Sequence, residues 1–142
     1  MKKLKVVVVI VINDKNEILL IKRGRKPFAG NWALISGTGE SRKGVKPEIG
    51  VIEEVNCDLQ TNSFEGKYAF SMPVRNDDLV DESVVFVGKV NQSEIKINPP
   101  FSLDYQWVSE KETKVFKNLS FEHGEIIEEY LRRRNLTKQK IS

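Results

Sequence analysis

The segment KVVVVIVINDKNEILLIKR, residues 5–23, decides the fold of this chain. Residues 6–12 form a continuous run of β-branched side chains, which is typical of a strand that is buried on both faces. The polar residues 13–16 predict a turn, and residues 17–22 then predict a partner strand. The sequence therefore predicts two paired strands at the start of the fold, of which the first is fully buried.

Helices are predicted at three places in the rest of the chain. Residues 47–55 begin with a proline, which suits the first helical position because its missing N–H would have no partner there. Ser109 and Glu112 have the spacing of a capping box, which predicts a second short helix. Residues 121–134 carry apolar side chains at helical spacing, and the polar residues after them predict a flexible tail over residues 136–142.

Three further strand-like segments are predicted at residues 67–72, 83–90 and 105–108. Because no repeat or linker divides the 142 residues, the sequence predicts a single domain over residues 1–142. This order of strands and helices predicts an α+β fold in which a mixed β-sheet lies between α-helices, since that arrangement buries the sheet on both faces.

The composition excludes several classes of protein. Hydrophobic residues make up 39% and charged residues 30% of the chain, which excludes a disordered chain and a membrane protein. The longest apolar run is too short for a transmembrane helix and has no cleavage site after it, so we expect a cytoplasmic protein. The net charge of +3 does not favour a nucleic-acid partner. The single cysteine, Cys57, excludes an internal disulfide and a metal site built from cysteines.

Four segments, in this order, resemble the Nudix hydrolases. VVVVIVINDKNEILLIKRG (residues 6–24) is similar to the first hairpin of that family, and KRGRKPFAGNWAL (22–34) is similar to the approach to its catalytic box in the ADP-ribose pyrophosphatase branch. LDYQWVSEKE (103–112) and LSFEHGEII (119–127) resemble later parts of the same branch. The resemblance implies a Nudix fold and the metal-dependent hydrolysis of a nucleoside diphosphate linked to another moiety, such as ADP-ribose.

The catalytic box of the family, G-x5-E-x7-R-E-U-x-E-E-x-G-U with U aliphatic, is only partly present. Glu53 and Glu54 match its paired glutamates, and the resemblance makes them the expected catalytic residues and metal ligands. The Arg-Glu pair of the box falls on Ile49 and Gly50. Positions 50, 53 and 54 share one face of a helix, so two of three carboxylates remain for a Mg²⁺ or Mn²⁺ ion. Glu40, on the preceding loop, is a further candidate ligand.

The substrate is expected to bind beside this box. Arg23, Arg25 and Lys26 follow the second predicted strand and are candidates to bind the diphosphate, because guanidinium groups pair well with phosphate. Gly37 and Gly39, in the glycine-containing loop that follows, are further candidates to bind the substrate. A solvated loop is the alternative interpretation of the three cations, and a solvated helix face is the alternative for the glutamate pair.

Three other side chains are interpreted structurally. Trp32 lies among apolar residues, which predicts that it packs in the core. His123 is predicted to cap or pack at the start of the terminal helix and not to act as a general base. Cys57 follows the predicted helix and is expected to pack as a small apolar group.

Three functions are compatible with these residues. The first is a metal-dependent hydrolase of a small-molecule nucleotide, and the second is a nucleotide-binding or sensor protein that has lost turnover. The third is a structural or RNA-associated domain that uses only the scaffold. The glutamate pair and the basic loop favour the first two functions, whereas Ile49 and Gly50 favour the second over the first. The resemblance also implies a homodimer.

Overall fold

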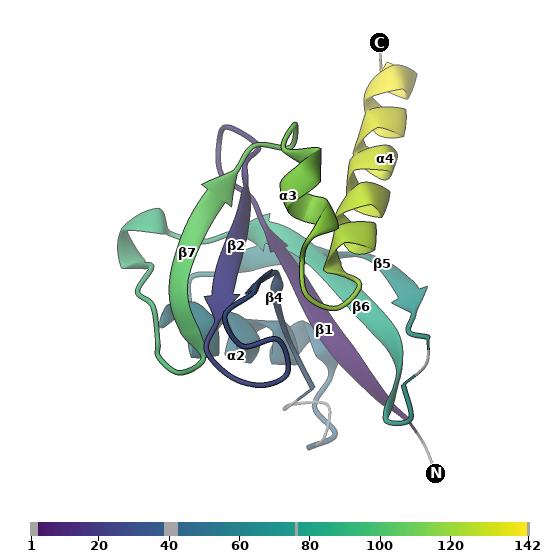
Figure 1. The fold of residues 1–142 in the computed structure, drawn as a ribbon. Helices are drawn as coiled ribbons and strands as arrows, with labels where there is room; N and C mark the ends of the chain where they lie inside the picture. The colour runs from purple at the N-terminus through teal and green to yellow at the C-terminus, as the bar shows by residue number, and fades with distance from the viewer. Residues whose placement is uncertain (1–2, 39–42, 76, 142) are drawn as a thin grey trace.

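The computed structural model in Figure 1 describes residues 3–38, 43–75 and 77–141 and contains two β-sheets. The first sheet has the strand order β4-β1-β6-β5, and the second has the order β3-β2-β7. The strands are β1 (Leu4–Val11), β2 (Ile18–Arg23), β3 (Trp32–Ala33), β4 (Ile35–Gly37), β5 (Glu65–Pro73), β6 (Val80–Lys89) and β7 (Ser102–Val108). The helices are α2 (Pro47–Leu59), a 3₁₀ turn (Gln92–Glu94), α3 (Thr113–Lys117) and α4 (His123–Ile141).

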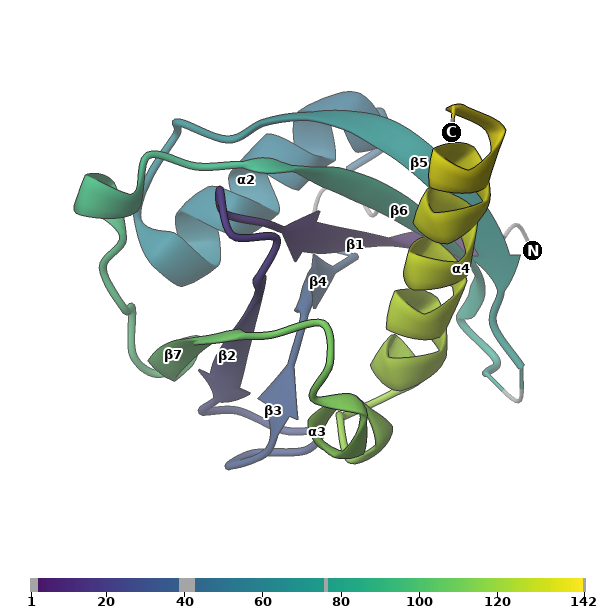
Figure 2. The ribbon, with the colours of Figure 1, turned by 90° about the horizontal axis from the view of Figure 1, so that it is seen from above.

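Strand β1 lies at the centre of the molecule. It pairs antiparallel with β4 and parallel with β6, so the first sheet is mixed, as predicted. Its side chains alternate between two hydrophobic clusters: Val7, Val9 and Val11 pack in the cluster that α2 completes, and Val8 and Ile10 pack in the cluster that α4 completes. Figure 2 shows α2 and α4 on different sides of β1. The predicted burial of this strand on both faces is confirmed.

The predicted pairing of the first two strands is wrong. Strand β2 belongs to the second sheet, and a single bridge between Ile12 and Ile18 joins it to the end of β1. Strand β6 pairs along one edge of β1 and β4 occupies the other edge at Val7–Val9, so β2 meets this strand only beyond its end. The turn between the strands is closed by Asn13, whose Oδ1 accepts hydrogen bonds from the backbone N–H groups of Lys15 (3.0 Å) and Glu17 (2.9 Å).

The predicted capping box is also wrong. The Ser109 Oγ accepts a hydrogen bond from the backbone N–H of Lys111 at 3.3 Å, and the backbone N–H of Glu112 donates instead to the Ser109 carbonyl at 2.9 Å. This backbone bond closes a turn, and α3 begins only at Thr113. The spacing of serine and glutamate therefore marks a turn that precedes the helix.

The other predicted elements are present but longer. Helix α2 continues four residues beyond the predicted end, and the predicted strands at 67–72 and 105–108 extend to Glu65–Pro73 and Ser102–Val108. Helix α4 runs to Ile141, so residues 136–141, which polarity predicted to be a tail, are helical. Trp32 is partly buried and packs against the cluster that α4 completes, as predicted. No helix in the described part of the chain is long and apolar enough to cross a membrane.

Ile10 offers a test of this central position, because its side chain is 0% exposed. We expect Ile10→Ala to lower the free energy of unfolding by about 2–5 kcal/mol, since it leaves a cavity in a packed core. Leu136→Ala on α4 is the control, because Leu136 is 45% exposed and its truncation should change stability by at most about 0.5 kcal/mol. Urea unfolding followed by circular dichroism measures both, and equal losses would contradict a core built around β1.

Candidate active site

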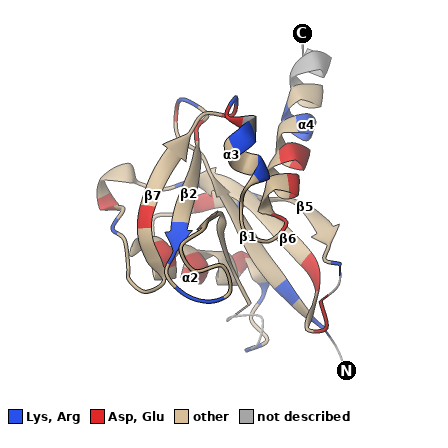
Figure 3. Cartoon of the chain, viewed as in Figure 1, with Lys and Arg blue, Asp and Glu red and all other residues tan. Residues whose placement is uncertain are grey.

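A cavity of about 990 Å³ opens between α2, the loop after β2, the loop between β5 and β6, and the start of α4. Its volume lies in the range of natural small-molecule sites. Figure 3 shows acidic residues on α2 and basic residues at the end of β2 and in the loop that follows. The predicted site residues that line the cavity are Arg23, Arg25, Lys26, Gly37, Glu53 and Glu54. Gly39 and Glu40 lie outside the described residues.

Glu54 is held close to strand β4. Its side chain is only 8% exposed, and a Cβ atom on Gly37 would overlap its carboxylate. The absence of a side chain at Gly37 is therefore what allows the carboxylate to approach the strand. Glu53 is the preceding residue on α2, lines the same cavity and is exposed. The glutamate pair thus presents one fixed and one accessible carboxylate.

Asp58 is an ionisable residue of this region that the sequence reasoning missed. It lies one helical turn after Glu54 and is 4% exposed. Burial, together with the charge of Glu54, raises the pKa of Asp58 to about 7, while Arg25 and Arg23 act in the opposite direction. The sequence did contain a signal for Asp58, because a spacing of four residues places it on the same helix face as Glu54. It was missed because it lies outside the catalytic box. Gly50, one turn before Glu54, is buried on the same helix.

Among the described residues, Glu53 and Glu54 fit a divalent metal ion whose remaining ligands are a bound phosphate and water. Among the described residues, no three His, Cys, Asp or Glu side chains are grouped so that they could hold a metal ion. Glu53 and Glu54 still supply two hard oxygen donors at one cavity. Mg²⁺ is commonly bound through one or two carboxylates, with substrate phosphates and water completing its coordination. The donor set therefore suits Mg²⁺ or Mn²⁺ in the presence of a phosphate ligand.

Arg23 is buried and held in place by two contacts. Its Nε donates a hydrogen bond to the Pro27 carbonyl at 2.8 Å, and its guanidinium lies 5.0 Å from the centre of the Phe121 ring. Burial and the charge of Arg25 lower the pKa of Arg23, while the charge of Asp58 raises it. An arginine remains cationic under such shifts, so this side chain contributes a fixed positive charge to the cavity.

The other two cations of the loop are more accessible. The Arg25 guanidinium lies 4.8 Å from the centre of the Phe101 ring, and both Arg25 and Lys26 are exposed. Together with Arg23 they line the same cavity as the acids of α2 and place positive charge there. Opposite charges across one cavity suit a ligand that carries both phosphate and a metal ion.

His123 packs inside the protein, as predicted. It is 3% exposed, and its Nδ1 accepts a hydrogen bond from the backbone N–H of Leu34 at 3.0 Å. Burial, with a smaller effect from Arg23, lowers the pKa of His123 to about 3. The imidazole is therefore neutral near pH 7. Cys57 is half-buried at the cavity wall, and burial raises the pKa of its thiol, so it remains protonated and packs as a weakly polar group.

Comparisons with known proteins agree with the arrangement of the fold. A family model described as "NUDIX domain" matches residues 1–130. The chain is 31% identical over 132 residues to an ADP-ribose pyrophosphatase of Methanocaldococcus jannaschii, an alignment that covers 88% of this chain and 72% of that protein.

Two solved structures have a similar fold. One is the NUDIX domain of Shewanella oneidensis NrtR complexed with ADP ribose, with a TM-score of 0.74 and 19% identity over 94% of this chain and 89% of that one. The other is a bifunctional NMN adenylyltransferase/ADP ribose pyrophosphatase from Francisella tularensis, complexed with AMP and a manganese ion. Its TM-score is 0.67 and its identity 19%, over 93% of this chain and 42% of that chain.

The buried ionisable groups predict opposite effects of pH on stability. The pKa of His123 is lower in the folded protein than its ordinary 6.5, so its contribution to stability is lost as pH falls from 6.5 towards 3. The pKa of Asp58 is raised from 3.8 to about 7, so its contribution is lost as pH rises between these values. Within its pH interval, each group changes the free energy of unfolding by about 1.4 kcal/mol per pH unit.

Single substitutions should separate the two slopes between pH 4.5 and 6.5. Asp58→Asn leaves the His123 effect, so stability should rise with pH more steeply than in the wild type. His123→Gln leaves the Asp58 effect, so stability should rise less steeply or fall. Urea unfolding in the presence of a chelator measures the free energy at each pH, and the other titrating groups are common to both variants. Parallel pH profiles for the two variants would be evidence against these shifts.

The close approach of Glu54 to Gly37 predicts a coupling between the two residues. Gly37→Ala should destabilise the protein by about 1–3 kcal/mol, because the new methyl group must displace the carboxylate. In a Glu54→Ala background the same change should cost much less, since the overlapping atoms are gone. A double-mutant cycle from urea unfolding measures the coupling. A cost that is the same in both backgrounds would mean that Glu54 does not lie against Gly37.

Proposed function

The chain belongs to the NUDIX domain family and is related to an ADP-ribose pyrophosphatase, and from this membership we propose that it hydrolyses the diphosphate of ADP-ribose with the help of a divalent metal ion. In this reaction water adds to one phosphorus and one bridging P–O bond breaks. The products are AMP and ribose 5-phosphate, so each hydrolysed molecule consumes one water.

The observation that carries the proposal is that the acids of α2 and the cations of the loop after β2 line one cavity. Negative charge develops on the bridging and terminal oxygens when a diphosphate is cleaved, and preorganised positive charge stabilises it. Arg23 is held rigidly and supplies such a charge, whereas the exposed Arg25 and Lys26 can reach the phosphates of an arriving substrate. These three cations are the proposed diphosphate clamp.

The proposed metal ligands are Glu53 and Glu54. Glu53 and Glu54 would hold a Mg²⁺ or Mn²⁺ ion, and the chemistry that such an ion supplies is polarisation of phosphate oxygens. Gly37 supports this role because it leaves room for the Glu54 carboxylate, and the exposed Glu53 can turn towards the ligand. Two further residues are proposed from the sequence alone. Gly39 is a proposed substrate-binding residue, and Glu40 is a proposed metal ligand.

A nucleotide-binding protein with little turnover is the second candidate. Gly50 favours it, because the buried helical position one turn before Glu54 carries no carboxylate. Fewer fixed carboxylates would leave the metal ion dependent on the substrate phosphates, which weakens its orientation and slows the reaction. Ligand binding without product is the result that separates this candidate from the hydrolase.

The test of the substrate is direct. Purified protein is incubated with ADP-ribose and Mg²⁺ or Mn²⁺, and the nucleotides are separated by chromatography. We expect AMP and ribose 5-phosphate in equal amounts, and no product when the metal ion is chelated. A thermal shift with ADP-ribose but no product supports the nucleotide-binding protein with little turnover. If there is no thermal shift and no product, both candidates are rejected.

The proposed residues are tested by matched substitutions on α2 and its neighbouring loop. Glu54→Gln should lower kcat/KM at least about tenfold, because it removes a charged ligand while preserving shape. Glu48→Gln is the control, since Glu48 is exposed on the same helix and lies outside the cavity-lining set, and it should leave kcat/KM unchanged. Arg25→Ala should lower kcat/KM by about 10- to 100-fold, the loss of a charge-assisted hydrogen bond. Equal activity of the Glu54 and Glu48 variants would overturn the assignment.

A further inference from the structure

The segment 98–102, which leads into β7, is fastened to the carboxyl end of α2 by two side-chain hydrogen bonds. The Ser102 Oγ donates to the Asp58 carbonyl at 2.6 Å, and the Asn98 Nδ2 donates to the Cys57 carbonyl at 2.7 Å. The last carbonyls of a helix have no partner within the helix, so these bonds satisfy two of them. They also fix the segment against the helix that carries the glutamate pair.

The same segment supports the basic loop after β2. The backbone of Gly24 lies so close to it that a Cβ atom at this position would overlap the Pro100 carbonyl oxygen. At the next residue of the loop, the Arg25 guanidinium lies over the Phe101 ring, 4.8 Å from its centre. Segment 98–102 therefore contacts both the helix that carries the acids and the loop that carries the cations.

The contact with Phe101 leaves the hydrogen-bond donors of Arg25 free. Among the residues that the structure describes, Arg25 makes no hydrogen bond and no ion pair, whereas the Nε of Arg23 is already bound to the Pro27 carbonyl. A guanidinium over an aromatic ring is held through attraction to the ring face, so its N–H groups remain available to a phosphate. Arg25 is exposed and lines the cavity, where a ligand can reach these donors.

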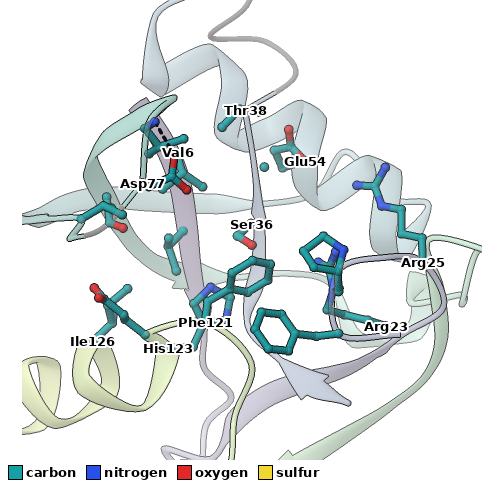
Figure 4. Close-up of a pocket in the computed structure, with 18 of the residues that line it drawn as sticks. Val6, Arg23, Arg25, Ser36, Thr38, Glu54, Asp77, Phe121, His123 and Ile126 are labelled. Carbon is teal, nitrogen blue, oxygen red and sulfur yellow. Dashed lines mark hydrogen bonds between the residues drawn. The ribbon is translucent and has the colours of Figure 1, made fainter. Parts of the chain in front are cut away.

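Arg25 is placed close to the last turns of α2. Burial raises the pKa of Asp58 and of the Cys57 thiol, and the positive charge of Arg25 acts against both shifts. Figure 4 shows the Arg25 side chain directed from its loop towards the helix that carries Glu54. A long side chain that is ordered only when a ligand arrives lowers the affinity for that ligand. A ring that already holds Arg25 beside the acids avoids this loss.

From this arrangement we infer that Phe101 is a positioning residue, whose ring holds the Arg25 guanidinium at the cavity so that its N–H groups meet a diphosphate already ordered. This inference rests on the proposed function, because it assumes that Arg25 binds a diphosphate. The role requires an aromatic ring and not only apolar volume, since the cation is attracted by the quadrupole of the π-electrons. Tyrosine can therefore replace Phe101, whereas leucine cannot.

The experiment measures the binding of inorganic pyrophosphate with Mg²⁺ by isothermal titration calorimetry, because pyrophosphate is a diphosphate without a base or a sugar. Phe101→Leu should weaken binding by about 2- to 12-fold, which corresponds to the cost of ordering one long side chain when the ligand binds. Phe101→Tyr keeps the ring and should bind pyrophosphate as the wild type does. Tyr68→Leu, at an exposed aromatic residue outside the cavity-lining set, is the matched control and should leave the affinity unchanged.

A double-mutant cycle shows whether Phe101 acts through Arg25. In an Arg25→Ala background, Phe101→Leu should leave the affinity for pyrophosphate unchanged, because the side chain that the ring positions is gone. A ring that served only to stabilise segment 98–102 would instead weaken binding equally in both backgrounds, and tyrosine would have no advantage over leucine in proportion to Arg25 binding.

Four results would each overturn the positioning role of Phe101. These are equal affinity of the wild type and Phe101→Leu, an equal loss with and without Arg25, the same loss in Phe101→Tyr as in Phe101→Leu, and no binding of pyrophosphate by the wild type. Product from ADP-ribose together with a pyrophosphate affinity that does not depend on Phe101 rejects the positioning role alone. An affinity that depends on Phe101 through Arg25, without product from ADP-ribose, supports the positioning role and rejects the hydrolase.

Discussion

The hydrogen bonding of β1 on both edges, together with the burial of both its faces, is the constraint on which the rest of the structure depends. Its antiparallel partner β4 ends at Gly37, and the cluster on the same side of β1 includes Val51 and Val55 of α2. Packing α2 on this side therefore brings Glu54, which lies between these two valines in sequence, against Gly37. The approach of Glu54 to Gly37 on β4 therefore follows from the packing of the core.

Helix α2 combines packing and charge on neighbouring positions. Val51, Val55 and Leu59 are core residues, while Glu54 and Asp58 are buried acids on the same helix. Burying a carboxylate is unfavourable, and the raised pKa of Asp58 expresses that cost. Nearby arginines offset part of it, so the loop after β2 and the helix are coupled electrostatically even before a ligand binds. Sites that concentrate such unfavourable groups commonly do so for binding or catalysis.

The extent to which the fold could be predicted depended on how local each signal was. The continuous apolar run of β1 and the proline at the start of α2 identified those elements, since burial and backbone geometry act within a few residues. The pairing of β2 could not be predicted in the same way, because it depends on which strands occupy the edges of β1. The interpretation of Ser109 failed for a related reason: the same spacing also suits a turn, and only the backbone bond of Glu112 distinguishes the two.

The sequence by itself determined the residue types available for the chemistry: the Glu53–Glu54 pair, the cations of the loop after β2, and the absence of a carboxylate at position 50. These follow from spacing along one helix or one loop. The tertiary structure alone decided that the acids and cations line one cavity, that Phe101 meets Arg25, and that a buried His123 is neutral. The physical reason is that contacts between distant segments, and the burial that shifts a pKa, depend on packing over the whole core and leave no periodic pattern in the sequence.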